Sequence, residues 1–222
     1  ATTECKGEGE EEVLVLDTRG ANDFAPQFIP GSVNFPVGIN GGEIMAPEEG
    51  NFGIWIGTML NPKTPLLVLS APGKEQESLQ RLARVGFQNV LGVLEGGIAA
   101  WVEAGLPTSS SGRCTLTGPE QLQGEVTILD VRTPGEFACT RPLGGHANGA
   151  INIPLPTMNK PGVFDGLDKD ATYLCYCQGG FRSAIAASFV RRAGLNVRDI
   201  VGGKTHMDKV ADSAMFRNSK AE

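Results

Sequence analysis

The chain of 222 residues carries a formal net charge of −6, with 41 % hydrophobic and 20 % charged residues. This composition is ordinary for one large or two small globular domains, and the acidic balance argues against nucleic-acid binding or a polybasic membrane contact. No apolar run approaches the roughly 18 residues that cross a bilayer, and no secretory signal is expected from the first dozen residues.

Four sequence blocks in the first half of the chain return in the same order in the second half. The matching pairs are 13–24 with 126–137, 29–36 with 147–154, 65–87 with 172–195, and 89–97 with 196–203. Such self-similarity indicates a duplicated domain. The stretch at 107–120 is rich in Ser, Thr, Gly and Pro and is typical of a linker. We therefore predict one domain over residues 1–111 and a second over residues 112–222.

The second copy shows the expected elements most clearly. Runs of apolar and β-branched residues at 126–131 and 149–154 predict strands, and "ATYLCYC" at 171–177 predicts a third. Apolar residues at helical spacing predict a helix over 183–192, and residues 197–203 predict a fourth strand. Strands that alternate with helices imply an α/β fold, in which each domain has a mostly parallel sheet flanked by helices on both faces.

Cys177 ends the third strand and opens the next helix, which is where ligands bind in open parallel sheets. A lone cysteine is most often a small buried hydrophobe, but three features distinguish this one. Gly179 and Gly180 allow backbone N–H groups to turn inward as an anion-binding nest. The helix N-terminus favours a thiolate, and Arg182 adds a fixed cation. We therefore predict that Cys177 is a nucleophile.

The string C-x-G-G-x-R-S at 177–183, with "LDVRTPGEF" at 129–137 and "GHANGAINIP" at 145–154, resembles the rhodanese family of sulfurtransferases. The resemblance covers nearly the whole chain and implies two tandem rhodanese-like domains. It implies that Cys177 takes a sulfane sulfur from a donor, carries it as a persulfide and passes it to a nucleophile. Arg182 would bind the anionic donor or close the loop. By the same match the substrate cradle consists of Gln178, Gly179, Gly180, Phe181 and Ser183.

Loop length and the first copy refine this interpretation. The loop from Cys177 to Arg182 is C-x4-R, whereas phosphatases on a related fold use a longer C-x5-R loop around a phosphoryl group, so the length favours sulfur chemistry. In the first copy Ser70 stands at the cysteine position and Glu75 at the arginine position. A serine without a neighbouring base is a poor nucleophile. We therefore predict that the first domain is catalytically silent.

Two residues upstream of the loop are further candidates for the site. Arg141 would help to attract an anionic donor, and a solvated surface arginine is the alternative interpretation. His146 would line the pocket, and a structural histidine bonded to the backbone is the alternative. The Asp-x-Arg sequence at 130–132 recurs at 17–19 in the silent copy. This recurrence favours a structural ion pair within each domain.

The chain has five cysteines: Cys5, Cys114, Cys139, Cys175 and Cys177. An odd number at irregular spacing argues against a secreted disulfide framework and predicts a reducing compartment, either the cytoplasm or an organelle interior. Cys175 shares a strand face with Cys177 and is expected in the core, whereas Cys139 is a candidate second thiol. Neither zinc-ligand spacing nor a nucleotide-binding loop is present, so no metal and no other cofactor is predicted.

These observations predict a sulfurtransferase that moves sulfane sulfur from thiosulfate, glutathione persulfide or another small persulfide to a thiol or cyanide. Two other classes remain open: a noncatalytic docking module, and a redox protein in which Cys177 pairs with Cys139 or Cys175. The segment "FGIWIGTML" at 52–60 resembles the tandem rhodanese region attached to metallo-β-lactamase-fold persulfide dioxygenases. This resemblance implies a metallo-β-lactamase-fold domain as a partner in a longer protein. The other expected partners are small molecules, not nucleic acid or a membrane.

Overall fold

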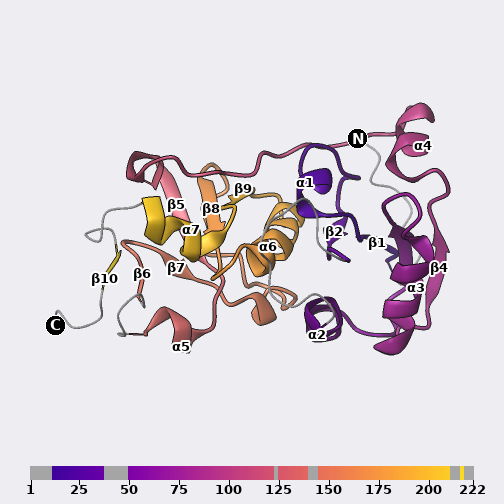
Figure 1. The fold of residues 1–222 in the computed structure, drawn as a ribbon, viewed down its shortest axis with the longest axis horizontal. Coiled ribbons are helices and arrows are strands. Elements are labelled where there is room, and N and C mark those ends of the chain that lie inside the picture. Colours follow the sequence, from indigo (N-terminus) through magenta and orange to yellow (C-terminus); the bar gives the residue numbers. More distant parts are fainter. Residues whose placement is uncertain (1–11, 38–49, 123–124, 140–144, 211–215, 218–222) are drawn as a thin grey trace.

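The computed structural model describes residues 12–37, 50–122, 125–139, 145–210 and 216–217. The first half of the chain forms a four-stranded parallel sheet in the order β2-β1-β3-β4 (Figure 1). Its elements are β1 (Leu14–Asp17), α1 (Ala21–Phe24), β2 (Val33–Asn34), α2 (Gly50–Met59), β3 (Leu66–Leu69), α3 (Glu75–Arg84), β4 (Val90–Val93) and α4 (Gly97–Glu103).

The second half repeats this topology with a parallel sheet in the order β7-β5-β8-β9. The short strands β6 and β10 form a separate antiparallel pair. This repetition confirms the predicted α/β class and the predicted duplication. The elements are η1 (Pro119–Leu122), β5 (Val126–Asp130), α5 (Pro134–Phe137), β6 (His146–Ala147), β7 (Ile151–Asn152), η2 (Leu155–Thr157), β8 (Thr172–Tyr176), α6 (Phe181–Arg192), β9 (Asn196–Asp199), α7 (Gly203–Val210) and β10 (Phe216–Arg217).

Both faces of the second sheet are covered by helices. Alternate residues of a strand point to opposite faces, and β8 is buried on both. Tyr173 and Cys175 pack in the large apolar cluster that contains residues of α6. Leu174 and Tyr176 pack in a second cluster that contains residues of α7. The strand that leads to Cys177 is therefore fixed from both sides.

Helix α6 also joins the two domains, and it lies between the two sheets in Figure 1. The ring of Phe189 meets the ring of Phe35 edge to face, with 6.0 Å between their centroids. The backbone N–H of Asn34 donates to Oγ of Ser188 over 3.0 Å. The large apolar cluster accordingly runs from the core of one domain into the core of the other. The helix that begins next to Cys177 ends in the domain interface.

The structure corrects the predicted bounds of two strands. The strand expected over 149–154 is reduced to β7, Ile151–Asn152. Residues 197–203 were expected to form one strand, but β9 ends at Asp199 and Gly203 begins helix α7. The chain turns here through φ angles of +73° at Gly202 and +53° at Gly203. Glycine allows this turn because it adopts positive φ angles without strain. Across the described residues, no helix is both long enough and apolar enough to span a membrane.

Candidate active site

Cys177 follows β8 directly, and its side chain is buried with 1 % exposure. Its Sγ accepts a hydrogen bond of 3.1 Å from the backbone N–H of Gly180. The hydroxyl of Ser183 lies 3.6 Å from Sγ and also bonds the carbonyl of Gly180 over 3.1 Å. Gly180 has a φ of +97°, a conformation that suits glycine. The loop therefore presents donors to the sulfur, which is the arrangement that stabilises negative charge there.

Helix α7 holds the other side of the cysteine loop. The N–H of Lys204 donates to the carbonyl of Cys177 over 2.7 Å, and the N–H of Thr205 donates to the carbonyl of Gln178 over 3.0 Å. In a trans peptide the C=O and the N–H point in opposite directions. Because both carbonyls point toward α7, the N–H groups of Gln178 and Gly179 point away from it. The first turn of α7 thus sets the orientation of the loop.

The approach of α7 to the loop requires glycine at two places. A Cβ on Gly203 would lie within 2.4 Å of the carbonyl oxygen of Cys177, and a Cβ on Gly180 would lie 3.0 Å from the N of Gly202. Sequence reasoning missed this support of the loop by α7. The adjacent glycines at 202–203 were the available signal, since paired glycines often mark a close backbone approach.

Arg182 forms a two-pronged ion pair with Glu136 of α5. Its Nη1 and Nη2 donate to the two carboxylate oxygens over 2.8 and 2.7 Å. Thr133, the N-cap of α5, donates to the same carboxylate from its backbone N–H over 3.0 Å and from its hydroxyl over 2.9 Å. The hydrogen bonds from Arg182 are the main reason that the pKa of Glu136 falls to about 2. This pairing favours the loop-closing role that was predicted as one of two for Arg182.

The remaining predicted site residues make contacts of different kinds. Nδ1 of His146 is 3.0 Å from the carbonyl of Phe137, and the two rings stack with 3.7 Å between centroids. These contacts match the structural alternative for His146. The exposed side chain of Gln178 bonds Thr205 over 3.2 Å, so it joins the loop to α7. Arg141 lies outside the described residues.

Phe181 and Gly179 complete the loop between Cys177 and Arg182. Phe181 is the first residue of α6 and is partly buried against the large apolar cluster. A Cβ added to Gly179 would meet no atom within 4 Å, so the loop has open space on that side. The predicted cradle residues are therefore contiguous in space around the cysteine, and Gly179 marks the side where a small ligand has room.

The Asp130–Arg132 pair is structural, as its recurrence in both copies predicted. Arg132 and Asp130 are almost fully buried, with 2.6 Å between Nη2 and Oδ2. The hydroxyl of Tyr176 donates to the same carboxylate over 2.6 Å, and Arg132 also bonds the carbonyl of Gly145. The carboxylate therefore has its partners within the fold. The equivalent ion pair of the first domain joins residues 17 and 19 over 2.6 Å.

In the first domain the polar groups of the equivalent loop are hydrogen bonded to side chains of the same domain. Ser70 hydrogen bonds the hydroxyls of Thr18 and Ser78, over 2.9 and 3.0 Å, and neither partner is a base. The N–H of Gly73, which aligns with Gly180, donates to the carboxylate of Glu75 over 3.2 Å. The carboxylate of Glu75 therefore accepts from the loop N–H that is equivalent to the Gly180 N–H, which donates to the sulfur of Cys177 in the second domain.

The other described cysteines differ in character from Cys177. Cys175 is fully buried, and burial raises the pKa of its thiol well above the ordinary range, which makes it unreactive. Cys114 and Cys139 are half-buried free thiols. Among the described residues, no three His, Cys, Asp or Glu side chains gather in a group able to hold a metal ion.

The comparisons with known proteins agree with the sequence resemblance. The family model described as rhodanese-like domain matches residues 4–104 and 119–207. A tRNA sulfurtransferase of Shewanella amazonensis is 36 % identical over 73 residues, which cover 33 % of this chain and 14 % of that protein. An uncharacterized protein of Synechocystis is 25 % identical over 114 residues, covering 51 % of this chain and 56 % of the relative. The chain thus spans less than two thirds of either relative.

Two solved structures with similarity to the chain match it over most of its length. The Tum1 protein from Saccharomyces cerevisiae is 15 % identical, with 95 % of this chain and 93 % of that chain covered and a TM-score of 0.46. A thiosulfate sulfurtransferase from Pseudomonas aeruginosa is 20 % identical, with coverages of 90 % and 39 % and a TM-score of 0.37.

Proposed function

The chain belongs to the rhodanese-like domain family, and from this premise we propose that it is a sulfurtransferase whose second domain carries sulfane sulfur on Cys177. The observation that carries the proposal is the hydrogen bond from Gly180 N–H to Cys177 Sγ. A sulfur that accepts a backbone N–H at the start of a helix is stabilised as an anion. The same donors suit a persulfide, whose outer sulfur also carries negative charge.

The proposed reaction has two displacement steps and no net oxidation of the protein. With thiosulfate as the donor, the Cys177 thiolate attacks the outer sulfur, the S–S bond of thiosulfate breaks, and sulfite leaves with the bonding electrons. An acceptor thiolate or cyanide then attacks the outer sulfur of the persulfide. The S–S bond to Cys177 breaks and the thiolate is regenerated. Glutathione persulfide would load the enzyme by the same first step, with glutathione as the leaving thiolate.

The environment of Cys177 supports a small donor. The side chain is almost fully buried, and the ion pair between Arg182 and Glu136 closes one side of the loop. Open space remains beside Gly179. A thiosulfate ion or a low-molecular-weight persulfide needs less room than a protein-bound persulfide. We assign a noncatalytic role to the first domain, because it has Ser70 at the position equivalent to Cys177 and a serine without a neighbouring base is a poor nucleophile.

The proposal is tested by the mass of the intact protein after brief exposure to thiosulfate and, separately, to glutathione persulfide. We expect a gain of one sulfur, about 32 Da, that is reversed by cyanide and is absent in Cys177→Ser. The donor that loads faster identifies the substrate class. If well-folded protein gains no sulfur from either donor, the sulfurtransferase proposal is wrong, and the docking module or the redox protein takes its place.

Two further variants separate the carrier mechanism from the redox alternative. Cys139→Ser and Cys175→Ser remove the two thiols that were considered as disulfide partners of Cys177. A single-cysteine carrier keeps its sulfur loading and its turnover in both variants. A redox pair loses turnover in one of them. Cys175 is buried in the core, so its variant is compared at equal fraction folded, measured by circular dichroism.

A further inference from the structure

A cavity of about 380 Å³ lies at the junction of the two domains. The first domain contributes Phe24, Phe28 and Ser32 to its lining, and the C-terminal end of α6 contributes Arg191 and Arg192. Cys177 precedes the opposite end of α6. The helix rises about 1.5 Å per residue, so its two ends are about 15 Å apart along the axis. The cavity is therefore separate from the cysteine loop.

Two side chains that line the cavity have unsatisfied polar atoms. Nη1 of Arg191 and Oγ of Ser32 are buried and have no hydrogen-bond partner within the described part of the chain. Such groups are rare in folded proteins and each one costs free energy, because it has lost its water without gaining a partner. The side chain of Arg191 is bonded instead through Nε, which donates to the carbonyl of Val197 over 3.5 Å.

The acidic group that interacts with Arg191, Asp199, is shared with a second arginine. Asp199 is engaged by Arg113, whose Nη2 and Nε approach one carboxylate oxygen over 2.7 and 3.0 Å. Arg192 donates from Nη1 to the carbonyl of Gly31 over 2.6 Å and from Nη2 to Glu12 over 3.0 Å. None of the residues lining the cavity is acidic. The cavity lining thus combines two arginines and serine hydroxyls with aromatic rings, and it holds no carboxylate.

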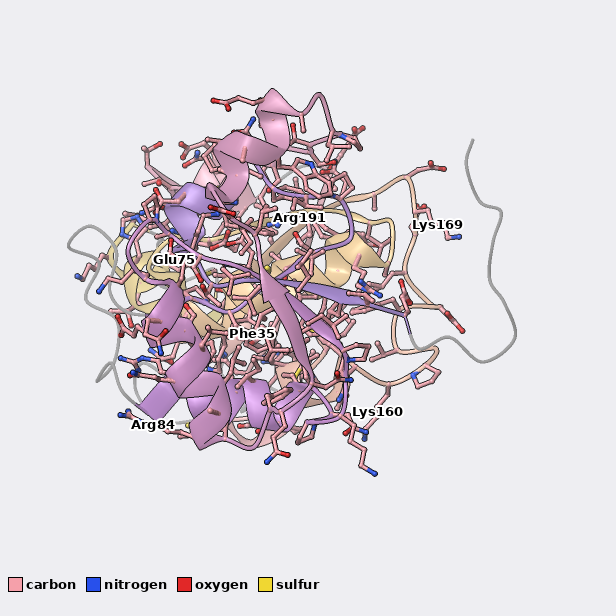
Figure 2. All side chains as sticks on the ribbon, turned by 90° about the vertical axis from the view of Figure 1, so that its right-hand side faces the viewer. Phe35, Glu75, Arg84, Lys160, Lys169 and Arg191 are labelled. Atoms are coloured by element: carbon pink, nitrogen blue, oxygen red, sulfur yellow. The ribbon has the colours of Figure 1, made fainter. Side chains whose placement is uncertain are left out.

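The position of Arg191 is fixed by aromatic packing. Its guanidinium carbon lies 5.7 Å from the centroid of the Phe24 ring and 5.5 Å from that of Phe28. These two rings are stacked on each other, with 4.7 Å between centroids. Burial lowers the pKa of Arg191. In the view of Figure 2 Arg191 falls near the middle of the outline of the molecule, whereas Arg84, in the last turn of α3, falls near its edge.

We propose that this cavity binds a small inorganic oxyanion, of the sulfate or phosphate type, held by Arg191 and Ser32. A tetrahedral oxyanion supplies acceptors to the free Nη1 and to the hydroxyl, and it neutralises the partly buried guanidinium. The volume exceeds by about tenfold the roughly 30 Å³ share of one water molecule, so the ion fits together with ordered water. This site is independent of the proposed sulfur transfer, because sulfate and phosphate carry no sulfane sulfur.

Isothermal titration calorimetry of the full chain tests the proposal. The protein is titrated with sulfate and, separately, with phosphate, at an ionic strength kept constant with chloride. We expect one saturable site in the unaltered protein. Arg191→Gln should weaken binding at least tenfold, and Ser32→Ala should weaken it several-fold. Arg84→Gln removes one charge from the matching end of α3 and should leave the affinity unchanged. Cys177→Ser should also leave it unchanged.

Three outcomes would overturn the proposal. The first is the absence of saturable binding by the unaltered protein, and the second is unchanged affinity in Arg191→Gln. The third is loss of binding in Cys177→Ser, which would place the anion at the cysteine loop. If Arg191→Gln does not fold, Ser32→Ala decides alone, and unchanged affinity in that variant overturns the proposal as well.

Discussion

The hydrogen bond from Gly180 to the sulfur of Cys177 has a counterpart in the first domain, where the N–H of Gly73 meets the carboxylate of Glu75. The two domains share a topology, so the difference is made by individual side chains. Ser70 and Glu75 were visible in the sequence as departures from the second copy. The bond between Gly73 and Glu75 was not, because it depends on the path of the loop. Residue identity predicts a silent first domain, and the bond between Gly73 and Glu75 adds a physical reason to that prediction.

Replacing Ser70 by cysteine tests this reason. We expect Ser70→Cys in the Cys177→Ser background to gain no sulfur from thiosulfate or glutathione persulfide. The loop N–H of Gly73 is already bonded to Glu75, and the carboxylate repels an anionic donor. Intact-protein mass after loading is the measurement, with the protein that retains Cys177 as the positive control. Loading comparable to that at Cys177 would contradict the assignment of the first domain as silent.

The ion pair of Arg182 with Glu136 gives a second prediction at this scale. The pKa of Glu136 is lowered from 4.5 to about 2. The stabilisation that its charge provides is therefore fully present above pH 4.5 and is lost as the pH falls toward 2. The carboxylate is about one third exposed, so removing the pair by Glu136→Gln should cost about 1 kcal/mol or less. The difference in melting temperature from the unaltered protein should be constant above pH 4.5 and shrink below it.

The same variant tests the role of Arg182 in the loop. If the ion pair closes the loop, Glu136→Gln should slow sulfur loading several-fold, followed by mass spectrometry over time. Glu77→Gln, which removes the 2.8 Å pair with Arg81 in α3 of the first domain, is the control and should leave loading unchanged. Faster loading in Glu136→Gln would show instead that Glu136 withholds Arg182 from the anionic donor.

Helices and strands differed in how well they could be predicted from their sequences. The strand before Cys177 and helix α6 were predicted within one or two residues, because their apolar spacing and a terminal glycine are local signals. Helix α7 was missed because it has only eight residues, Gly203–Val210, and its first residue was assigned to the preceding strand. Its contact with the cysteine loop joins residues about 27 positions apart, as between Gln178 and Thr205. No local pattern reports such a contact.

Gly203→Ala tests whether α7 orients the loop. An added Cβ would overlap the carbonyl of Cys177, and the φ of +53° disfavours any other residue. We expect sulfur loading to fall more than tenfold while the protein remains folded. Gly194→Ala is the matched control: its φ is +83°, but a Cβ there meets no atom within 4 Å. That control should cost about 1 kcal/mol of unfolding free energy and leave loading unchanged.

On the scale of the molecule, the two domains form one packed unit through α6. The duplication in the sequence predicted two similar domains but not how they meet. The contacts between the domains are not repeated in the two copies, so the repeat does not indicate them. The contact of α6 with β2 includes Ser188 and Asn34 as well as the aromatic pair Phe35 and Phe189. Arg113 adds a bond to Asn22 across the junction, over 2.6 Å. The interface therefore depends on residues specific to each copy.

This interface predicts that the two domains unfold together. Phe35→Ala and Phe189→Ala should each cost about 3–5 kcal/mol, because each leaves a cavity in the shared core. A double-mutant cycle should give a coupling of about 0.5–1.5 kcal/mol, the range for an edge-to-face aromatic pair. Combining Phe189→Ala with Leu82→Ala, in α3 of the first domain, should be additive within about 0.5 kcal/mol.

Calorimetry distinguishes one cooperative unit from two. We expect a single transition, because the apolar cluster is continuous across the junction. Either Phe substitution should lower the melting temperature of this common transition. Two separated transitions, with Phe189→Ala affecting only one of them, would show that the domains fold independently. In that case the first domain would not support the helix that begins at the sulfur site.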